Sequence, residues 1–312
     1  MKKAVVFFLV AASGCGGGDR AAAPAEQRAV DLAAFRPQNE FRGRIVFQSD
    51  LDGDNEIYLL ARDGLRRLTD NTWSDEFPRW SPDGRRIAFI AKPMDRYQVF
   101  VMNDDGTDVV QVTRSENDAI EPGWFPDGRR LAYTEERKRT IGRSYTMFSI
   151  DLETGREERL LPKFDGSNAL PDFSPVAPLL AFTGKKTVGW GVYLADLTTG
   201  ESRVLTTGGG ACRPRFSPDG REIVYVSSSA DGKGDIWLMK ADGSGQERLT
   251  ELPETYDYFP AWSPDARYAV FASGTKHYPT EGVWSLALVK VGTKTVVPLF
   301  RSGARDVFPD WR

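Results

Sequence analysis

The chain of 312 residues is 40% hydrophobic, 12% aromatic and 27% charged, a globular composition with ample material for a buried core. Its 30 glycines and 19 prolines are too many for a helical protein of this size and indicate a chain that turns often. A net charge of -3 without a long basic run argues against a nucleic-acid partner, and a single histidine excludes every metal site that needs two imidazoles.

The N-terminal segment has the pattern of an export signal. Two lysines precede the apolar run 4–12, which is long enough for the hydrophobic part of a signal peptide but too short to span a bilayer. The small residues that follow end at Cys15 and resemble the lipobox of bacterial lipoproteins, in which the cysteine is diacylated. We expect a signal peptide over 1–14 and a lipidated cysteine with a flexible tether over 15–40, with cleavage of an ordinary secretory signal as the alternative. Gly16 favours, by the same resemblance, the outer membrane facing the periplasm over the inner membrane.

A thirteen-residue motif then recurs along the chain. FPRWSPDGRRIAF at 77–89 returns as EPGWFPDGRRLAY at 121–133, and an aromatic residue stands two positions after the proline in every copy. All copies but the last continue through a proline turn into a short apolar strand, and we assign the aspartates of these turns a structural role. The repeated prolines, spaced by about 45 residues, are Pro78, Pro122, Pro171, Pro214, Pro260 and Pro309.

Each unit contains four short strands. After the proline turn and its apolar strand comes a third strand, followed by a DG or TG turn and a fourth strand that often ends in LT. Four strands in about 45 residues, without helical periodicity in the mature chain, predict an all-β fold: a six-bladed β-propeller of four-stranded blades. The third strands are expected at 56–61, 98–103, 146–151, 191–196, 235–240 and 283–288.

The two ends of the repeat region complement each other. The first unit begins near Gly43 with its second strand, and the chain ends at 308–312 with a first strand that nothing follows. We expect the strand of Trp311 to pair with the strand at 45–47, because this pairing closes the ring and leaves no open sheet edge. The prediction is one propeller domain over 41–312.

The repeat, F-P-x-W-S-P-D-G-x-x-I-A-F followed by I-Y-x-M-x-x-D-G-x-x-x-x-L-T, resembles that of TolB-type propellers, also called WD40-like or PD40 repeats. The resemblance covers nearly the whole mature chain, whereas the tether stands in the place of the N-terminal α/β domain of TolB. It implies a propeller that docks a periplasmic or outer-membrane protein, as TolB docks the peptidoglycan-associated lipoprotein Pal. We expect a monomer, attached to the membrane through its lipid anchor.

Blade topology gives the position of the predicted binding site. Loops that join one blade to the next, and loops between second and third strands, lie on one face of a propeller, which we call the channel face. Its loops at 49–56, 134–145, 185–191, 229–235 and 273–282 are long and varied, and aromatic rings beside charged groups are usual anchors of recognition. The alternative is that the acids cap strand starts and the rings shield blade ends. The predicted partner-binding residues are Trp73, Asp75, Glu76, Asp118, Glu121, Trp190, Tyr256, Asp257, His277, Tyr278 and Asp306.

One loop carries a weak calcium signal. Asp50, Asp52, Asp54 and Glu56 bring four carboxylates into seven residues, but Gly53 comes too early for the EF-hand order. We interpret the segment as a polar loop and expect neither a metal nor a cofactor.

The sequence favours binding over catalysis. There is no GxSxG elbow and no second histidine, and Cys212, the one thiol left after lipidation of the other cysteine, is expected to be buried. The predicted function is a lipid-anchored, non-catalytic scaffold of the cell envelope. The alternative is a carbohydrate-active enzyme, a lyase or hydrolase, that uses paired carboxylates on the channel face.

Overall fold

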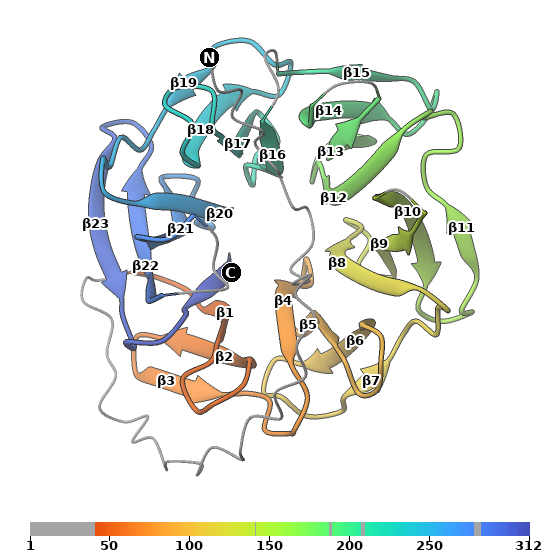
Figure 1. The fold of residues 1–312 in the computed structure, drawn as a ribbon, viewed down its shortest axis with the longest axis horizontal. Helices are drawn as coiled ribbons and strands as arrows, with labels where there is room; N and C mark the ends of the chain where they lie inside the picture. The colour runs from red at the N-terminus through yellow and green to blue at the C-terminus, as the bar shows by residue number, and fades with distance from the viewer. Residues whose placement is uncertain (1–40, 141, 187–188, 207–209, 278–281) are drawn as a thin grey trace.

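The computed structural model describes residues 41–140, 142–186, 189–206, 210–277 and 282–312. Within these residues every regular element is a β-strand, and six four-stranded antiparallel sheets stand around a central channel (Figure 1). The six-bladed propeller predicted from the sequence is confirmed. Segment 1–40, with Cys15, and Tyr278 lie outside the described residues. In the described part of the chain, no helix has the length and apolar character needed to cross a membrane.

Each blade is named here by its order around the ring, and its strands are given from the channel outward. Blades 1 and 2 consist of β24 (Val307–Trp311), β1 (Ile45–Ser49), β2 (Glu56–Ala61) and β3 (Gly64–Arg67), and of β4 (Asp75–Trp80), β5 (Arg86–Ala91), β6 (Gln98–Asn103) and β7 (Val110–Gln111). Blades 3 and 4 consist of β8 (Asp118–Trp124), β9 (Arg130–Lys138), β10 (Arg143–Asp151) and β11 (Glu157–Arg159), and of β12 (Ser167–Phe173), β13 (Leu179–Lys185), β14 (Gly191–Asp196) and β15 (Ser202–Val204). Blades 5 and 6 consist of β16 (Ala211–Phe216), β17 (Glu222–Ser227), β18 (Asp235–Lys240) and β19 (Glu247–Arg248), and of β20 (Tyr256–Trp262), β21 (Tyr268–Gly274), β22 (Trp284–Lys290) and β23 (Thr295–Phe300).

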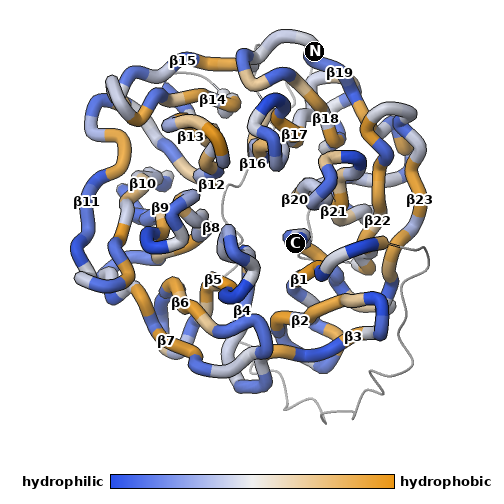
Figure 2. The backbone as a smooth tube through the Cα atoms, turned by 180° about the vertical axis from the view of Figure 1, so that it is seen from behind, coloured by the Kyte–Doolittle hydropathy of each residue, from blue (hydrophilic) through white to orange (hydrophobic). Residues whose placement is uncertain are grey.

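The core lies between the blades. The second strands are almost continuous apolar runs, such as IVFQS in β1 and YAVFASG in β21, because each blade packs against a neighbour on both of its faces. Large rings at the middle of these strands, among them Phe47, Phe182 and Phe271, are 0% exposed. The outermost strands β7, β11, β15 and β19 are short and largely exposed. Figure 2 shows hydrophobic segments within the blades, for example at β2, β6 and β22. Burial of the apolar runs therefore holds the ring together.

The proline turns have the structural role expected of them. In the turn after β4, Asp83 Oδ1 accepts hydrogen bonds from Ser81 Oγ at 2.6 Å and from the N–H of Arg85 at 3.1 Å. The hydrogen bond from Ser81 is the main cause that keeps the pKa of Asp83 below its usual value. Asp219 and Asp265 accept the same bond from the serine of their own turns. These acids shape the turns and have no catalytic geometry.

The C-terminal strand closes the ring, as predicted. Strand β24 pairs antiparallel with β1, with Ile45 opposite Trp311. Beyond the strands, the N–H of Arg312 donates to the carbonyl of Arg44 at 2.8 Å, and Trp311 Nε1 donates to the carbonyl of Arg42 at 2.7 Å. The sheet of blade 1 is therefore built from both ends of the described chain.

Candidate functional site: a cavity on the propeller axis

Each inner strand contains one irregular step. At this step a residue other than glycine adopts the left-handed backbone conformation and precedes a proline, and the pairing register of the inner strand shifts. Such a shift is a β-bulge, which redirects a side chain and tolerates proline. The left-handed residues, with φ between 53° and 60°, are Phe77, Glu121, Leu170, Arg213, Phe259 and Phe308.

Polar side chains of the preceding blade hold these bulges in place. The N–H of Arg213 donates to Thr183 Oγ1 at 2.9 Å, and the N–H of Leu170 donates to Thr134 Oγ1 at 3.3 Å. A left-handed residue other than glycine costs on the order of 1–3 kcal/mol, and such strain concentrates at functional sites. The same strained step in all six inner strands therefore directs attention to the channel.

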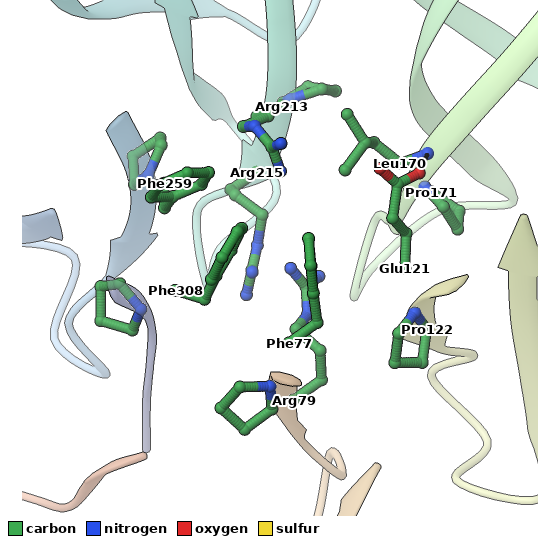
Figure 3. Close-up of a pocket in the computed structure, with 14 residues that line it drawn as sticks. Phe77, Arg79, Glu121, Pro122, Leu170, Pro171, Arg213, Arg215, Phe259 and Phe308 are labelled. Atoms are coloured by element: carbon green, nitrogen blue, oxygen red, sulfur yellow. Dashed lines mark hydrogen bonds between the residues drawn. The ribbon is translucent and has the colours of Figure 1, made fainter. Parts of the chain in front are cut away.

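The six left-handed residues and the prolines that follow them line a cavity of about 50 Å³, here called the axial cavity (Figure 3). Most of its wall is apolar: the ring of Phe308 lies 3.8 Å from that of Phe77 and 3.9 Å from that of Phe259, measured between centroids. Four ionisable side chains complete the wall: Arg79 of blade 2, Glu121 of blade 3, and Arg213 and Arg215 of blade 5.

Aromatic faces, and not carboxylates, surround the guanidinium of Arg213. Its Cζ lies 4.5 Å from the ring centroid of Phe259 and 5.5 Å from that of Phe308, which are cation–π distances. Arg213 is only 9% exposed, and within the described residues its guanidinium has no hydrogen bond and no ion pair. A buried guanidinium normally pairs its N–H donors. These donors are therefore available to a group that enters the axial cavity.

Glu121, a predicted site residue, also lines the axial cavity with part of its carboxyl group unpaired. Its Oε2 accepts a hydrogen bond from the N–H of Leu170 at 3.2 Å, whereas its buried Oε1 has no partner among the described residues. Burial raises the pKa of Glu121 to about 8, against the opposing charge of Arg213. The carboxyl group is therefore mostly protonated near neutral pH, and it can donate as well as accept a hydrogen bond.

A ring of four charged side chains, here called the charged belt, lies two residues further along the inner strands. Its members are paired: Arg79 Nη2 lies 2.8 Å from Asp172 Oδ1, Arg215 Nε lies 3.0 Å from the same oxygen, and Arg215 also pairs with Asp310. The second oxygens of the two acids accept the N–H groups of Phe216 and Trp80, each at 2.7 Å. Each charged side chain of the belt thus has a partner within the protein.

Gly123 makes room for this arrangement. It occupies the belt position of blade 3, between Arg79 and Asp172 in ring order, and a Cβ there would lie 2.6 Å from the carbonyl oxygen of Pro171. A side chain at this position would therefore separate the inner strands of blades 3 and 4.

Three of the predicted partner-binding acids are fully buried. Asp75, Asp257 and Asp306 are each 0% exposed. Asp306 accepts hydrogen bonds from the hydroxyl of Ser49 at 2.8 Å and from the hydroxyl of Ser302 at 2.7 Å. These acids cap the starts of the inner strands. Because their side chains are not exposed, they cannot contact a partner directly, and we reassign them a structural role.

Glu76 and Asp118 are engaged inside the same face. Glu76, 4% exposed, accepts hydrogen bonds from the hydroxyl of Tyr97 at 2.8 Å and that of Ser74 at 2.7 Å. Asp118 is partly exposed and accepts the N–H of Tyr97 at 2.9 Å. Glu76 is thus held inside the protein by hydrogen bonds to its Oε1, and we assign it a structural role.

The predicted aromatic residues remain accessible. Trp73 is 38% exposed, and Trp190 is half-buried with its ring edge against Tyr145. Tyr256 is half-buried and contacts the exposed ring of His277, with 5.2 Å between ring centroids. Trp73, Trp190, Tyr256 and His277 are therefore the predicted residues that the structure leaves open to a partner.

The acids of the 50–56 loop do not gather into a metal site. Asp50 accepts the N–H and the Nε of Arg305 at 2.8 and 2.7 Å, and Asp52 forms an ion pair with Arg67. Nowhere in the described chain do three or more histidine, cysteine or acidic side chains form a group that could hold a metal ion.

Glu56 and Asp75 form the kind of carboxylate pair on which the enzyme alternative depends. Burial raises the pKa of Glu56 to about 8 and that of Asp75 to about 6. Glu56 accepts hydrogen bonds from Thr69 and from the N–H of Asn71, and Asn71 Nδ2 donates to Asp75 at 2.6 Å. The two acids are 1% and 0% exposed, so a sugar ring cannot reach them. They connect the last loop of blade 1 to the inner strand of blade 2.

Comparisons with known proteins agree with this architecture. The model of a family described as the TolB beta propeller domain matches residues 86–299. An uncharacterized protein of Agrobacterium fabrum is 30% identical over 229 residues, which cover 70% of this chain and 72% of that protein. A TolB homolog of Chlorobium luteolum is 32% identical over 216 residues, covering 66% of this chain and 46% of the relative. The crystal structure of TolB from Acinetobacter baumannii has a TM-score of 0.73 at 19% identity, covering 88% of this chain and 67% of that one.

Enzymes also occur among the similar proteins. Dipeptidyl-peptidase 5 of Porphyromonas endodontalis is 28% identical over 246 residues, which cover 72% of this chain but 33% of the peptidase. The chain thus spans between a third and about half of the length of several curated relatives that it matches.

Proposed function

The chain belongs to the TolB β-propeller family, and on this premise we propose that it is a non-catalytic scaffold of the cell envelope that binds a protein on its channel face. The observation that carries the proposal is the distribution of exposed rings. Trp73 and Trp190 lie in channel-face loops of different blades, and Tyr256 and His277 lie at the same face of blade 6, whereas the proline turns of the opposite face use their polar groups internally. Rigid rings with polar edges are preferred anchors of protein interfaces.

The best candidate contact area lies where blades 5 and 6 meet. Here Tyr256 stacks beside Tyr258, contacts His277, and has the ammonium of Lys233 5.8 Å from its ring centroid. A second accessible area includes Trp73 and Met94, which are 38% and 83% exposed. Apolar groups of this size on two sides of one face support the docking of a protein rather than of a small sugar.

Catalysis is less well supported. The chain supplies one histidine, and the paired carboxylates Glu56 and Asp75 are enclosed, so neither an imidazole-based nor a carboxylate-based site is offered to a substrate. The peptidase relatives are matched over 33% and 42% of their length, and we do not extend their activity to this chain.

The proposed location is the periplasmic side of the outer membrane, with Cys15 as the lipid anchor. The export pattern of the first residues supports it, and so does the name Tol-Pal system protein TolB, carried by a Francisella tularensis relative that is 26% identical over 251 residues. By the same reasoning we propose a lipoprotein of the Pal type as the partner. Cys15→Ser is then expected to move the protein from the membrane fraction to the soluble periplasmic fraction.

Affinity capture from a detergent-solubilised envelope, followed by titration of the purified candidate partner, tests the proposal. The triple variant Trp73→Ala, Tyr256→Ala, His277→Ala is expected to lose at least about tenfold in affinity, because rings of this kind often dominate an interface. The double variant Val176→Ala, Val204→Ala, which removes exposed side chains away from the channel face, is the matched control. Equal affinity of both variants for every captured protein would contradict docking on the channel face.

A further inference from the structure

We propose that the axial cavity is a binding site for a small carboxylate, with Arg213 as the residue that takes the negative charge. This inference goes beyond the docking of a protein partner and does not depend on it. It rests on two buried polar side chains that line the same cavity and that both keep hydrogen-bonding capacity unused within the described residues.

The first step concerns the charge. Arg213 brings a permanent positive charge to a cavity in which the described residues provide no ion-pair partner for it. The phenylalanine rings that surround it stabilise the cation through their faces but accept no N–H hydrogen bond in the guanidinium plane. The guanidinium still requires a negative charge and hydrogen-bond acceptors. A carboxylate provides both, because its two oxygens can accept two parallel N–H donors of a guanidinium.

The second step concerns Glu121. An ionised acid beside the cavity would repel an incoming carboxylate, but burial raises the pKa of Glu121 to about 8, so that near neutral pH it carries a proton. A protonated carboxyl group can donate to an oxygen of the ligand, and Glu121, whose Oε1 has no partner among the described residues, is one of the residues that line the cavity. The oxygens of the ligand would thus receive donors from the inner strands of two different blades.

The third step concerns size and shape. A cavity of about 50 Å³ holds a group of few heavy atoms and is far below the several hundred Å³ of a site for a drug-sized molecule. Its apolar wall, formed by Phe77, Phe308 and Leu170 among others, suits a short aliphatic chain beside the carboxylate. The charged belt cannot supply the binding charge in place of Arg213, because its arginines are already paired with Asp172 and Asp310. Propionate is therefore a suitable probe.

Titration calorimetry of the full mature chain with sodium propionate at pH 7 tests the proposal, with sodium chloride and the neutral amide propionamide as controls. We expect a dissociation constant on the order of millimolar, as befits so few atoms, and no binding of propionamide. Arg213→Met, which keeps the volume but removes the charge, is expected to weaken propionate at least about tenfold. Arg129→Met is the matched control, because this arginine is exposed at 68% of its side chain and lies in the turn between β8 and β9, outside the lining of the axial cavity. Glu121→Gln keeps an N–H donor and should retain binding within about threefold.

A free metabolite and the side chain of a bound protein are the two sources of such a carboxylate, and a second arm of the experiment separates them. A blocked pentapeptide with a central aspartate is compared with its asparagine counterpart. Binding of propionate that depends on Arg213 supports a free carboxylate, and binding of only the aspartate peptide, again dependent on Arg213, supports delivery by a protein. If neither probe binds, or if Arg213→Met binds as well as the wild type, the proposal is wrong. Should Arg213→Met fail to fold, the Nε–H resonance of Arg213 in the ¹⁵N-labelled wild type gives the answer: a saturable shift with propionate supports the site, and an unchanged resonance overturns it.

Discussion

Replacing Trp311 by alanine should release the joint that closes the propeller. The indole is 8% exposed, meets Phe41 edge to face with 5.9 Å between ring centroids, and donates from Nε1 to the carbonyl of Arg42 at 2.7 Å. Large-to-small changes of a buried aromatic residue cost about 3–5 kcal/mol, of which about 1 kcal/mol is expected from the lost hydrogen bond. This is a large fraction of the roughly 5–15 kcal/mol that stabilises a typical protein.

Urea unfolding followed by far-UV circular dichroism measures the effect. Trp311→Ala should lower the free energy of unfolding by about 3–5 kcal/mol, and Trp311→Phe by about 1–2 kcal/mol, because phenylalanine keeps most of the ring contact but has no N–H donor. Trp73→Ala is the control: this ring is 38% exposed and lies outside the joint, so its loss should cost under about 1 kcal/mol.

Comparing the three variants tests whether the closure of the ring by β24 stabilises the fold. A loss of less than about 1 kcal/mol in Trp311→Ala, with an unchanged dependence of stability on urea, would show that closure by β24 contributes little. Equal losses of unfolding free energy in Trp311→Ala and Trp73→Ala would likewise show that the joint between β24 and β1 does not contribute specially to stability.

The other predictions concern the residues around the channel, and each is checked by the same unfolding measurement. Asp172→Ala leaves two half-buried arginines without their shared carboxylate and should cost about 3–5 kcal/mol, against about 1 kcal/mol for the turn residue Asp127; similar losses would contradict the charged belt. The pKa of Glu121 is raised from 4.5 to about 8 in the folded protein, so its contribution to stability is full below pH 4.5 and is lost as the pH rises towards 8. The difference in unfolding free energy between Glu121→Gln and the wild type should therefore shift by roughly 2–3 kcal/mol in favour of the variant between pH 5 and 7, and a constant difference would refute a raised pKa. Gly123→Ala should destabilise by more than about 1 kcal/mol because its Cβ would meet backbone at 2.6 Å, whereas Gly292→Ala, with open space around it, should be neutral or mildly stabilising; the reverse order would show that the strands move apart freely.

The fold could be predicted because its evidence is periodic. The motif at 77–89 specifies an inner strand, a proline turn and a second strand. Its recurrence about every 45 residues specifies the number of blades. The joint of β24 with β1 followed from the two incomplete units, since an open sheet edge would otherwise remain at each end.

The axial cavity could be predicted only in part. Its positions are visible in the sequence as the residue before each repeated proline, but the residue types there include Phe77, Glu121, Leu170 and Arg213 and show no common chemistry. These residues share a left-handed backbone conformation and a position at the axial cavity. Both follow from the bulge in the inner strand and not from the type of side chain. Glu121 was selected as an acid on the channel face, whereas Arg213 and the phenylalanine rings were missed.

The buried acids show a second limit. In the sequence, an acid that caps a strand looks the same as an acid on a recognition surface. The sequence therefore left open whether Asp75, Asp257 and Asp306 cap strands or contact a partner. The outcome depends on serine, threonine and asparagine donors that come from other loops and blades, such as Ser49 for Asp306, at a sequence separation of 257 residues. Pairings over such distances in the chain have no local signature.

The participation of β24 in blade 1 also has a consequence for biosynthesis. The segment Val307–Trp311 is synthesised after every other strand of the propeller, so blade 1 obtains its innermost strand only when the other five blades have been translated. Until then the edge of β1 stays open and the channel wall has a missing sector, a state in which partly made chains are prone to aggregate. A nascent propeller of this kind therefore becomes a closed ring in one late step, after all of its other strands have been synthesised.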